Sequence, residues 1–338
     1  MKALAIKYRP QAFEDVTEQG STVTILRNQL ETNSIKHCYL FCGPAGCGKT
    51  TLARIFAKEA NKGIGNIIEL DAASNNGVDD VRRIIDQAQT KPLEGQYKTF
   101  IIDECHSLSK QGWQAFLKLI EEPPATAIFI FCTTDPETIP KTIISRVQRY
   151  QFQKISTQGI INRLLYVLNE ESNQNQDDEL YKAVEYIARV AAGGMRDALT
   201  MLDKCLAFNE ELTVSNVMEA LSIADYTTFI HLTDALVNKV DTNIIHILED
   251  VYNSGFDLKQ FIKQYIEFML DVCKYNTVHD ISYTQLPGTD DIKTFLDNVD
   301  KDICLDILDL LLSIDRDIKY SPNPRVYIEA LLLTGGRN

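Results

Sequence analysis

The 338-residue sequence lacks the long apolar segments of membrane and exported proteins. No apolar run reaches the ~18–20 residues of a transmembrane helix, and the opening MKALAIKYRPQAF has no apolar core like that of a signal peptide. Hydrophobic residues make up 45% of the chain and charged residues 24%, which is ordinary for a globular protein and unlike a disordered one. We therefore expect a cytoplasmic protein of two or three domains, without a membrane partner.

Paired cysteines are also missing. None of the eight cysteines forms a CxxC pair, so the sequence indicates neither a zinc ribbon nor a disulfide framework. We expect reduced core thiols and no zinc. The eight residues are Cys38, Cys42, Cys47, Cys105, Cys132, Cys205, Cys273 and Cys304.

Basic residues are in deficit, since 34 Lys and Arg face 47 Asp and Glu, for a formal net charge of −13. Such a protein should be repelled by nucleic-acid phosphates. The acidity is uneven, however: residues 216–338 hold 20 acidic and 10 basic side chains, whereas residues 1–215 hold 27 and 24. The charge therefore argues against unspecific DNA binding by the lone chain, and most of it belongs to the C-terminal third.

Short β-rich runs alternate with helical patterns up to about residue 152, which predicts a parallel sheet covered by helices on both faces. Beyond this point the patterns are helical, interrupted by polar stretches at 169–179 and 285–291 that we interpret as loops. The expected strands are HCYLFCG at 37–43, NIIELDA at 66–72, KTFIIDE at 98–104 and AIFIFCTT at 127–134.

The strongest motif is GPAGCGKT at 43–50, a full GxxxxGK[ST] match between an expected strand and an expected helix. Glycines let backbone N–H groups turn toward phosphates, and the helix N-terminus adds a positive dipole end. Lys49 is expected to reach the β- and γ-phosphates and the Thr50 hydroxyl to ligate Mg²⁺. A chance glycine-rich turn is the alternative, and the flanking strand and helix argue against it.

A second motif, FIIDECH, places Asp103 and Glu104 at the end of an apolar strand. Open α/β sheets bind ligands at that edge, so we expect Asp103 to hold Mg²⁺ and Glu104 to orient or deprotonate a water. Ordinary surface carboxylates at a strand end are the alternative. His106 would fit a DExH helicase, but the helical C-terminal third offers no second sheet domain, and His106 is otherwise expected to lie near the site without a chemical role.

These motifs resemble the AAA+ clamp-loader ATPases, in particular the bacterial DNA polymerase III gamma/tau type. The resemblance begins at LAIKYRPQAFEDV, continues through the motifs above and GGMRDAL at 193–199, and reaches SPNPR at 321–325. EEPP and TTDPETIP favour the bacterial branch over replication factor C small subunits. The resemblance implies an α/β AAA+ core at 1–152, a small helical lid at 153–215 and an all-α collar for oligomerisation at 216–338.

The resemblance also implies roles for single residues. Thr134 takes the sensor-1 position, Arg146 projects into a neighbouring subunit's ATP site, and Arg196 is the sensor-2 arginine of the lid. For both arginines a surface salt bridge is the alternative. The implied nucleotide contacts are Gly43, Pro44, Ala45, Gly46, Cys47, Gly48, Lys49, Thr50 and Thr51, with Tyr8 and Arg9 beside the adenine unless they form a packed N-terminal arm.

The sequence departs from the family pattern in several places. The four-cysteine zinc module is replaced by NKGIGN at 61–66, Val147 stands where a cysteine is usual, and Glu18-Gln19 replaces Gly-Gln. The sequence ends after the collar motif, so we expect a short form without tau-type extensions, of host or phage origin.

The implied function is an ATPase subunit of a homo- or hetero-oligomeric ring that uses ATP and Mg²⁺ to place a sliding clamp on primer–template DNA. DNA would be held through its phosphates, with Arg82, Arg83 and Lys110 as candidates unless they are solvated charges. The clamp would meet the region of Trp113 and Phe116, although core packing is expected for at least one. The alternatives are a helicase loader or branch-migration motor, or an ATP-binding scaffold without hydrolysis.

Overall fold

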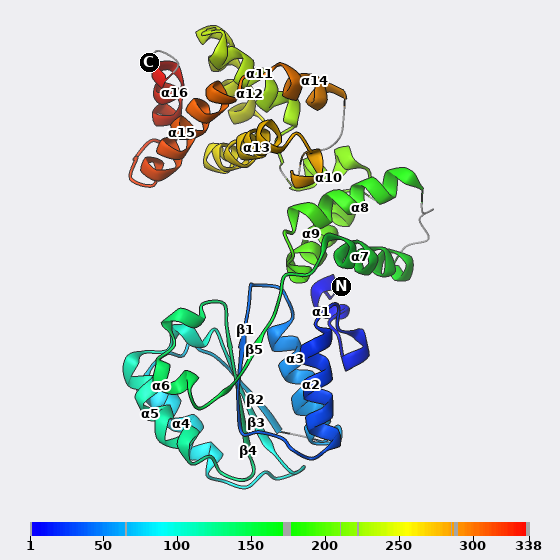
Figure 1. Ribbon diagram of the computed structural model, residues 1–338, viewed down its shortest axis with the longest axis vertical. Helices are drawn as coiled ribbons and strands as arrows, with labels where there is room; N and C mark the ends of the chain where they lie inside the picture. The colour runs from blue at the N-terminus through cyan, green and yellow to red at the C-terminus, as the bar shows by residue number, and fades with distance from the viewer. Residues whose placement is uncertain are drawn as a thin grey trace. The chain divides into compact units, whose positions relative to one another are not determined.

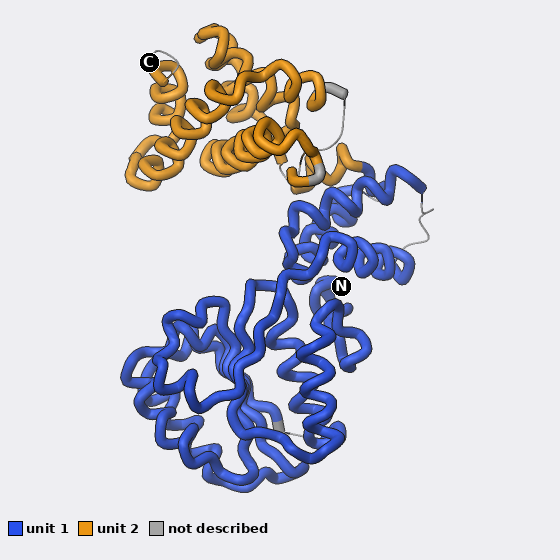
Figure 2. The backbone as a smooth tube through the Cα atoms, in the orientation of Figure 1, with its two compact units in different colours: residues 1–213 blue, residues 214–338 orange. Residues whose placement is uncertain are grey.

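The computed structural model describes residues 2–64, 66–171, 177–209, 211–221, 223–284, 286 and 290–335. The chain forms two compact units, residues 1–213 and 214–338 (Figure 2). Parts of the two expected loops, at 172–176 and around 285–289, lie outside the described residues. Within the described ranges, no helix has the length and apolar character needed to cross a membrane.

The first unit contains a five-stranded parallel sheet in the order β2-β3-β4-β1-β5. The four expected strands are confirmed, and β5 is a short polar strand that the sequence patterns did not indicate. Their bounds are β1 Cys38–Cys42, β2 Asn66–Asp71, β3 Lys98–Asp103, β4 Ala127–Thr133 and β5 Gln148–Gln151.

Helices cover both faces of this sheet, as expected for an α/β core (Figure 1). Side chains alternate between the faces along each strand: Phe129 and Phe131 pack on one side, and Ile128 and Ile130 on the other. One face is covered by α2 (Gly20–Glu31) and α3 (Lys49–Ala60), the other by α4 (Val78–Ala88), α5 (Lys110–Glu121) and α6 (Lys141–Ile144).

A bundle of three helices completes the first unit, with the N-terminal helix packed against it. The strands and the bundle are joined by the segment after β5, whose Ile155 N–H donates to the Gly193 carbonyl at 3.2 Å. The helices are α1 (Leu4–Lys7), α7 (Thr157–Glu171), α8 (Asp178–Val190) and α9 (Met195–Phe208), and the short 3₁₀ turns of the unit are η1 (Phe13–Asp15), η2 (Cys105–Ser107) and η3 (Pro136–Thr138).

The second unit is helical around its own hydrophobic core. Stacked rings form its centre, with Phe229 5.3 Å from Tyr265 and 5.4 Å from Phe268 between ring centroids. The elements are α10 (Val214–Leu221), α11 (Tyr226–Val237), α12 (Asp241–Asn253), α13 (Leu258–Val278), η4 (Ile281–Tyr283), α14 (Asp290–Asn298), α15 (Lys301–Ile318) and α16 (Pro324–Gly335).

Candidate nucleotide-binding site

The loop between β1 and α3 has three glycines at positions where a side chain would clash or would strain the backbone. The N–H of Gly43 donates to the Thr133 carbonyl at 3.2 Å, and a Cβ on Gly43 would lie 2.6 Å from the Phe152 carbonyl oxygen. Gly46 and Gly48 have φ values of +70° and +100°, in the region that glycine tolerates best. Each glycine of the motif is therefore favoured by the structure, Gly43 by lack of space and Gly46 and Gly48 by their backbone conformation.

Lys49 begins α3 and is buried, with 6% of its surface exposed. Its ammonium group donates to the carbonyls of Gly43 at 2.9 Å and Pro44 at 2.7 Å. A buried ammonium that donates to loop carbonyls is suited to exchange them for anionic oxygens. The loop, the helix N-terminus and this cation together form a phosphate-binding arrangement.

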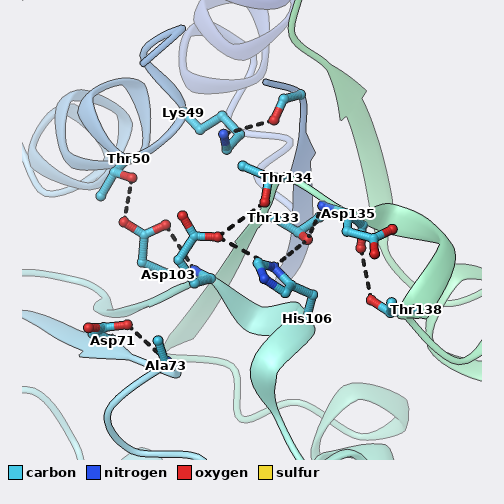
Figure 3. A network of polar contacts seen from close by, with 12 residues as sticks. Lys49, Thr50, Asp71, Ala73, Asp103, His106, Thr133, Thr134, Asp135 and Thr138 are labelled. Atoms are coloured by element: carbon cyan, nitrogen blue, oxygen red, sulfur yellow. Dashed lines mark hydrogen bonds and ion pairs between the residues drawn. The ribbon is translucent and has the colours of Figure 1, made fainter. Parts of the chain in front are cut away.

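Asp103 ends β3, on the same edge of the sheet as the loop. Its Oδ2 accepts a hydrogen bond from the Thr50 hydroxyl at 2.7 Å, and its Oδ1 accepts from the Glu104 N–H at 3.0 Å (Figure 3). A hydroxyl and a carboxylate side by side at a phosphate loop are the oxygen ligands that Mg²⁺ prefers. The residues thus fit the expected metal.

A cavity of about 470 Å³ lies beside the loop, large enough for a nucleotide. Arg54 and Arg163 also line it, and neither was singled out from the sequence. The predicted residues that border it are Tyr8, Arg9, Ala45, Gly46, Cys47, Gly48, Lys49, Thr50, Thr51, Asp103, Glu104 and Arg196.

The start of α9 closes against the phosphate loop. The Met195 N–H donates to the Gly46 carbonyl at 3.1 Å, and a Cβ on Gly46 would lie 3.0 Å from the Gly194 Cα. This contact between backbones places exposed Arg196, in the first turn of α9, at the cavity. A shift of α9 would therefore displace the phosphate loop at Gly46.

The N-terminal segment is fastened to α7 through Tyr8. The Tyr8 hydroxyl and the Lys7 ammonium both reach the Glu171 carboxylate, at 2.5 Å each, and Arg163 donates to the Tyr8 carbonyl at 2.8 Å. The hydrogen bonds from Lys7 and Tyr8 lower the pKa of Glu171. Tyr8 is therefore both a packed residue of the N-terminal arm and a lining residue of the cavity. The two alternatives that the sequence left open for Tyr8 are compatible.

Glu18 and Gln19 hold the segment between the strands and α7. Glu18, with φ +59°, accepts from the Ser156 N–H at 2.7 Å and from its hydroxyl, at the start of α7. Gln19 exchanges hydrogen bonds with the backbone of Gln153, at 3.0 and 3.3 Å. Ser156 caps α7 by accepting from the Gly159 N–H at 3.0 Å, and Glu18 holds this capping residue in place, which the sequence alone did not indicate.

Arg146 lies away from this cavity, at the end of α6. Its guanidinium contacts Glu121 at 2.9 Å and donates to the Thr142 carbonyl at 2.8 Å. Thr134, by contrast, is brought to the site, where its hydroxyl donates to Glu104 Oε2 at 3.4 Å.

The candidate DNA contacts are at the surface. Arg82 and Arg83 pair with Asp79 and Asp80 of their own helix, at 3.1 and 3.3 Å, and Lys110 is the exposed first residue of α5. These ion pairs match the alternative of solvated charges, so the DNA contacts stay predictions.

Trp113 and Phe116 both belong to the core. They are 3% and 0% exposed and pack on Phe131 of β4, with ring centroids 5.4 Å apart in each pair. The expected core role thus holds for both, and neither side chain is presented to a clamp in this arrangement.

The cysteines are all buried with free thiols. Burial raises the pKa of Cys38 to about 12 and that of Cys205 to about 11. Among the described residues no group of three or more His, Cys, Asp or Glu side chains is arranged to hold a metal ion. The expected lack of zinc stays a prediction.

Family models match most of the chain. Residues 64–156 match the model "DNA polymerase III, delta subunit", 159–211 match "DNA polymerase III clamp loader subunit, ATPase lid domain", and 212–334 match "DNA polymerase III subunits gamma and tau domain III".

Curated relatives agree. The chain is 34% identical to DNA polymerase III subunit tau of Bacillus subtilis, covering 98% of this chain and 62% of that protein. It is 31% identical to subunit gamma of Buchnera aphidicola, covering 98% and 97%, and 30% identical to subunit tau of Escherichia coli, covering 98% and 55%. The chain thus spans little more than half the length of these two tau subunits and nearly all of the gamma subunit.

The solved structures show the fold. RuvB of Thermotoga maritima, a Holliday junction branch migration motor, superposes with a TM-score of 0.54 at 17% identity, covering 74% of this chain and 86% of that one. A phosphate loop, an Asp-Glu strand end and a region matching the lid-domain model on this fold define a protein of the AAA+ class. With the relatives above, the chain belongs to the DNA polymerase III gamma/tau family of clamp-loader subunits.

Proposed function

We propose that this chain is the ATPase subunit of a sliding-clamp loader, which uses ATP binding and hydrolysis to place the clamp on primer–template DNA. The observation that carries the proposal is that Lys49, the Thr50–Asp103 pair, Glu104 and Arg196 border one cavity. An ATP-binding scaffold without hydrolysis would not need this complete set.

Within the cavity, Lys49 and the loop N–H groups hold the phosphates, and Thr50 and Asp103 hold Mg²⁺, which supplies charge neutralisation when bound. Tyr8 and Arg9 lie along the adenine side. Glu104 orients the attacking water or takes its proton, and Thr134 next to it senses the γ-phosphate.

Arg196 couples the lid to the γ-phosphate, since the start of α9 already contacts the phosphate loop through Gly46. Arg146 acts in trans, at the site of a neighbouring subunit, where it stabilises the charge of the transition state. Each site is then complete only at a subunit interface, so ATP supplies a difference in affinity between an assembled and a relaxed ring.

The division into core at 1–152, lid at 153–215 and collar at 216–338 is part of the proposal. The unit boundary at 213 and 214 and the family models at 159–211 and 212–334 support it. The acidic collar joins subunits, and DNA is held in the ring by phosphate contacts from Arg82, Arg83 and Lys110. The loader works in the cytoplasm of a bacterium or of a phage-infected host.

Clamp loading itself tests this function. The complex that co-purifies with the chain is identified by mass analysis, and the clamp of the same genome is then labelled and incubated with nicked, primed circular DNA. Retention of the clamp on the circle, dependent on ATP and abolished by Lys49→Ala, is the expected result. A complex that moves a four-way DNA junction with ATP and leaves the clamp in solution would instead support a branch-migration motor.

A further inference from the structure

His106 lies in the turn after Glu104 and has no part in the function proposed above. Its Nδ1 is 3.3 Å from Glu104 Oε2 and 3.2 Å from the Thr133 hydroxyl (Figure 3). The imidazole is 28% exposed and Thr133 is fully buried at the end of β4. The ring thus stands between the carboxylate of the hydrolytic site and the neighbouring strand.

The backbone brings these groups together by an unusual turn. Glu104 has φ +47°, a left-handed conformation that is unfavourable for a residue with a Cβ. The chain then enters η2 at once, with the Ser107 N–H donating to the Glu104 carbonyl at 2.9 Å. Strain of this kind persists where the surroundings fix it, and here it turns His106 back onto the carboxylate.

The two oxygens of the Glu104 carboxylate have different neighbours. Thr134 donates to Oε2 at 3.4 Å, and His106 Nδ1 lies beside the same oxygen. Within the described part of the chain both neighbours engage Oε2, which leaves Oε1 to meet a water in the cavity that Glu104 borders. A carboxylate anchored at one oxygen presents the other in a fixed direction.

His106 Nδ1 can form one strong hydrogen bond at a time, with either Glu104 or Thr133. When Nδ1 carries the proton it can donate it to Glu104 Oε2, 3.3 Å away, and when it lacks the proton it accepts from the Thr133 hydroxyl. Thr133 Oγ1 also accepts from the Asp135 N–H at 3.0 Å, so this hydroxyl has its own proton to give. The tautomer of His106 therefore decides whether Glu104 is anchored.

We propose that His106 is a positioning residue for Glu104, which it anchors through Nδ1–H so that the carboxylate faces the attacking water. The proposal rests on the hydrolytic role proposed for Glu104. It extends that role to a second residue, because the histidine of the Asp-Glu-Cys-His motif then belongs to the hydrolytic site.

The test uses two substitutions that copy one ring nitrogen each. The amide of His106→Asn lies near the position of Nδ1, whereas the amide of His106→Gln extends to that of Nε2. His106→Ala removes both. Single-turnover ATP hydrolysis is measured in the assembled complex with clamp and primed DNA, together with ATP affinity from a fluorescent analogue and thermal stability.

We expect His106→Ala and His106→Gln to lower the rate constant for hydrolysis about tenfold, as loss of a hydrogen bond to a charged group would, with ATP affinity within about twofold of the wild type. His106→Asn should recover most of the rate. In the Glu104→Gln background, His106→Ala should cause no further loss, because a residue that acts through Glu104 has nothing left to position.

The outcomes separate the two proposals. If Glu104→Gln hydrolyses ATP at the wild-type rate, the hydrolytic role of Glu104 is wrong and the positioning role fails with it. If Glu104→Gln hydrolyses ATP slowly while His106→Ala is fully active, or if the losses of the two single variants multiply in the double variant, only the positioning role is overturned. Equal losses in Asn and Gln variants would likewise contradict an action through Nδ1.

Discussion

Glu121 and Arg146 form an ion pair, 2.9 Å between Oε1 and Nη2, at one edge of the AAA+ core. Both side chains are partly exposed, at 48% and 39%, so the pair contributes little stability. The arginine can therefore leave Glu121 at small cost when a stronger anionic partner, such as a nucleotide phosphate of a neighbouring subunit, is offered.

Replacement of Arg146 by Ala should leave ATP affinity unchanged and lower hydrolysis in the assembled complex by about 10³-fold, as loss of an arginine acting in trans does in related phosphoryl transfers. Nucleotide binding and single-turnover hydrolysis are measured on the same preparation. Loss of binding would place Arg146 in its own subunit's site and contradict action in trans.

The matched control is Glu121→Gln, which removes the ion pair and keeps the arginine. If Arg146 matters only for the local structure, the two variants should behave alike. We expect instead that Glu121→Gln changes stability by less than about 1 kcal/mol and retains hydrolysis. The contrast between the variants isolates the charge that Arg146 presents to its neighbour.

Thr50 tests the metal site. Thr50→Ala removes the hydroxyl 2.7 Å from Asp103 and should raise the Mg²⁺ concentration for half-maximal hydrolysis by about 10–100-fold, the range typical for loss of a group that supports a metal. Thr50→Ser keeps the hydroxyl and should stay near the wild type. Equal Mg²⁺ dependence in all three proteins would show that Thr50 holds no metal.

The glycines of the phosphate loop should differ in their tolerance. Gly48→Ala meets no atom within 4 Å and costs only the left-handed backbone, about 1–2 kcal/mol. Gly43→Ala adds a clash with the Phe152 carbonyl and should cost about 3 kcal/mol. Urea unfolding compares the two variants; an equal loss would mean that the loop relaxes away from Phe152.

Thiol reactivity tests the buried cysteines. Burial raises the pKa of Cys205 to about 11 and of Cys304 to about 12, so near neutral pH both remain protonated and unreactive. A thiol reagent should modify all eight cysteines after unfolding and almost none in the native protein at pH 8. Since a raised thiol pKa favours the protonated form, stability should fall as the pH rises above the ordinary thiol range. Rapid native modification of one thiol would contradict the burial.

The sequence patterns predicted the sheet best where strands are buried on both faces. A short, continuous apolar run between prolines, such as Ala127–Thr133, is typical of a buried strand. They missed β5, whose polar residues leave only Tyr150 buried. The 3.6-residue period placed Trp113 and Phe116 on one face of a helix, and tertiary packing then turned that face to the core.

Contacts between distant segments could not be predicted from the sequence. The pairing of Arg146 with Glu121 and of Tyr8 with Glu171 depends on how helices meet, and no local spacing encodes it. The approach of His106 to Glu104 depends on a left-handed residue that propensity disfavours. Motifs therefore located the site, while the partners of its side chains required the fold.

ATP turnover with and without the clamp and primed DNA distinguishes a clamp-loader ATPase from an ATPase that acts alone. We expect low basal hydrolysis that rises several-fold only when clamp and DNA are both present, and that is lost in Lys49→Ala and Glu104→Gln. Fast hydrolysis by the isolated chain that ignores clamp and DNA would contradict the assignment as a clamp-loader ATPase.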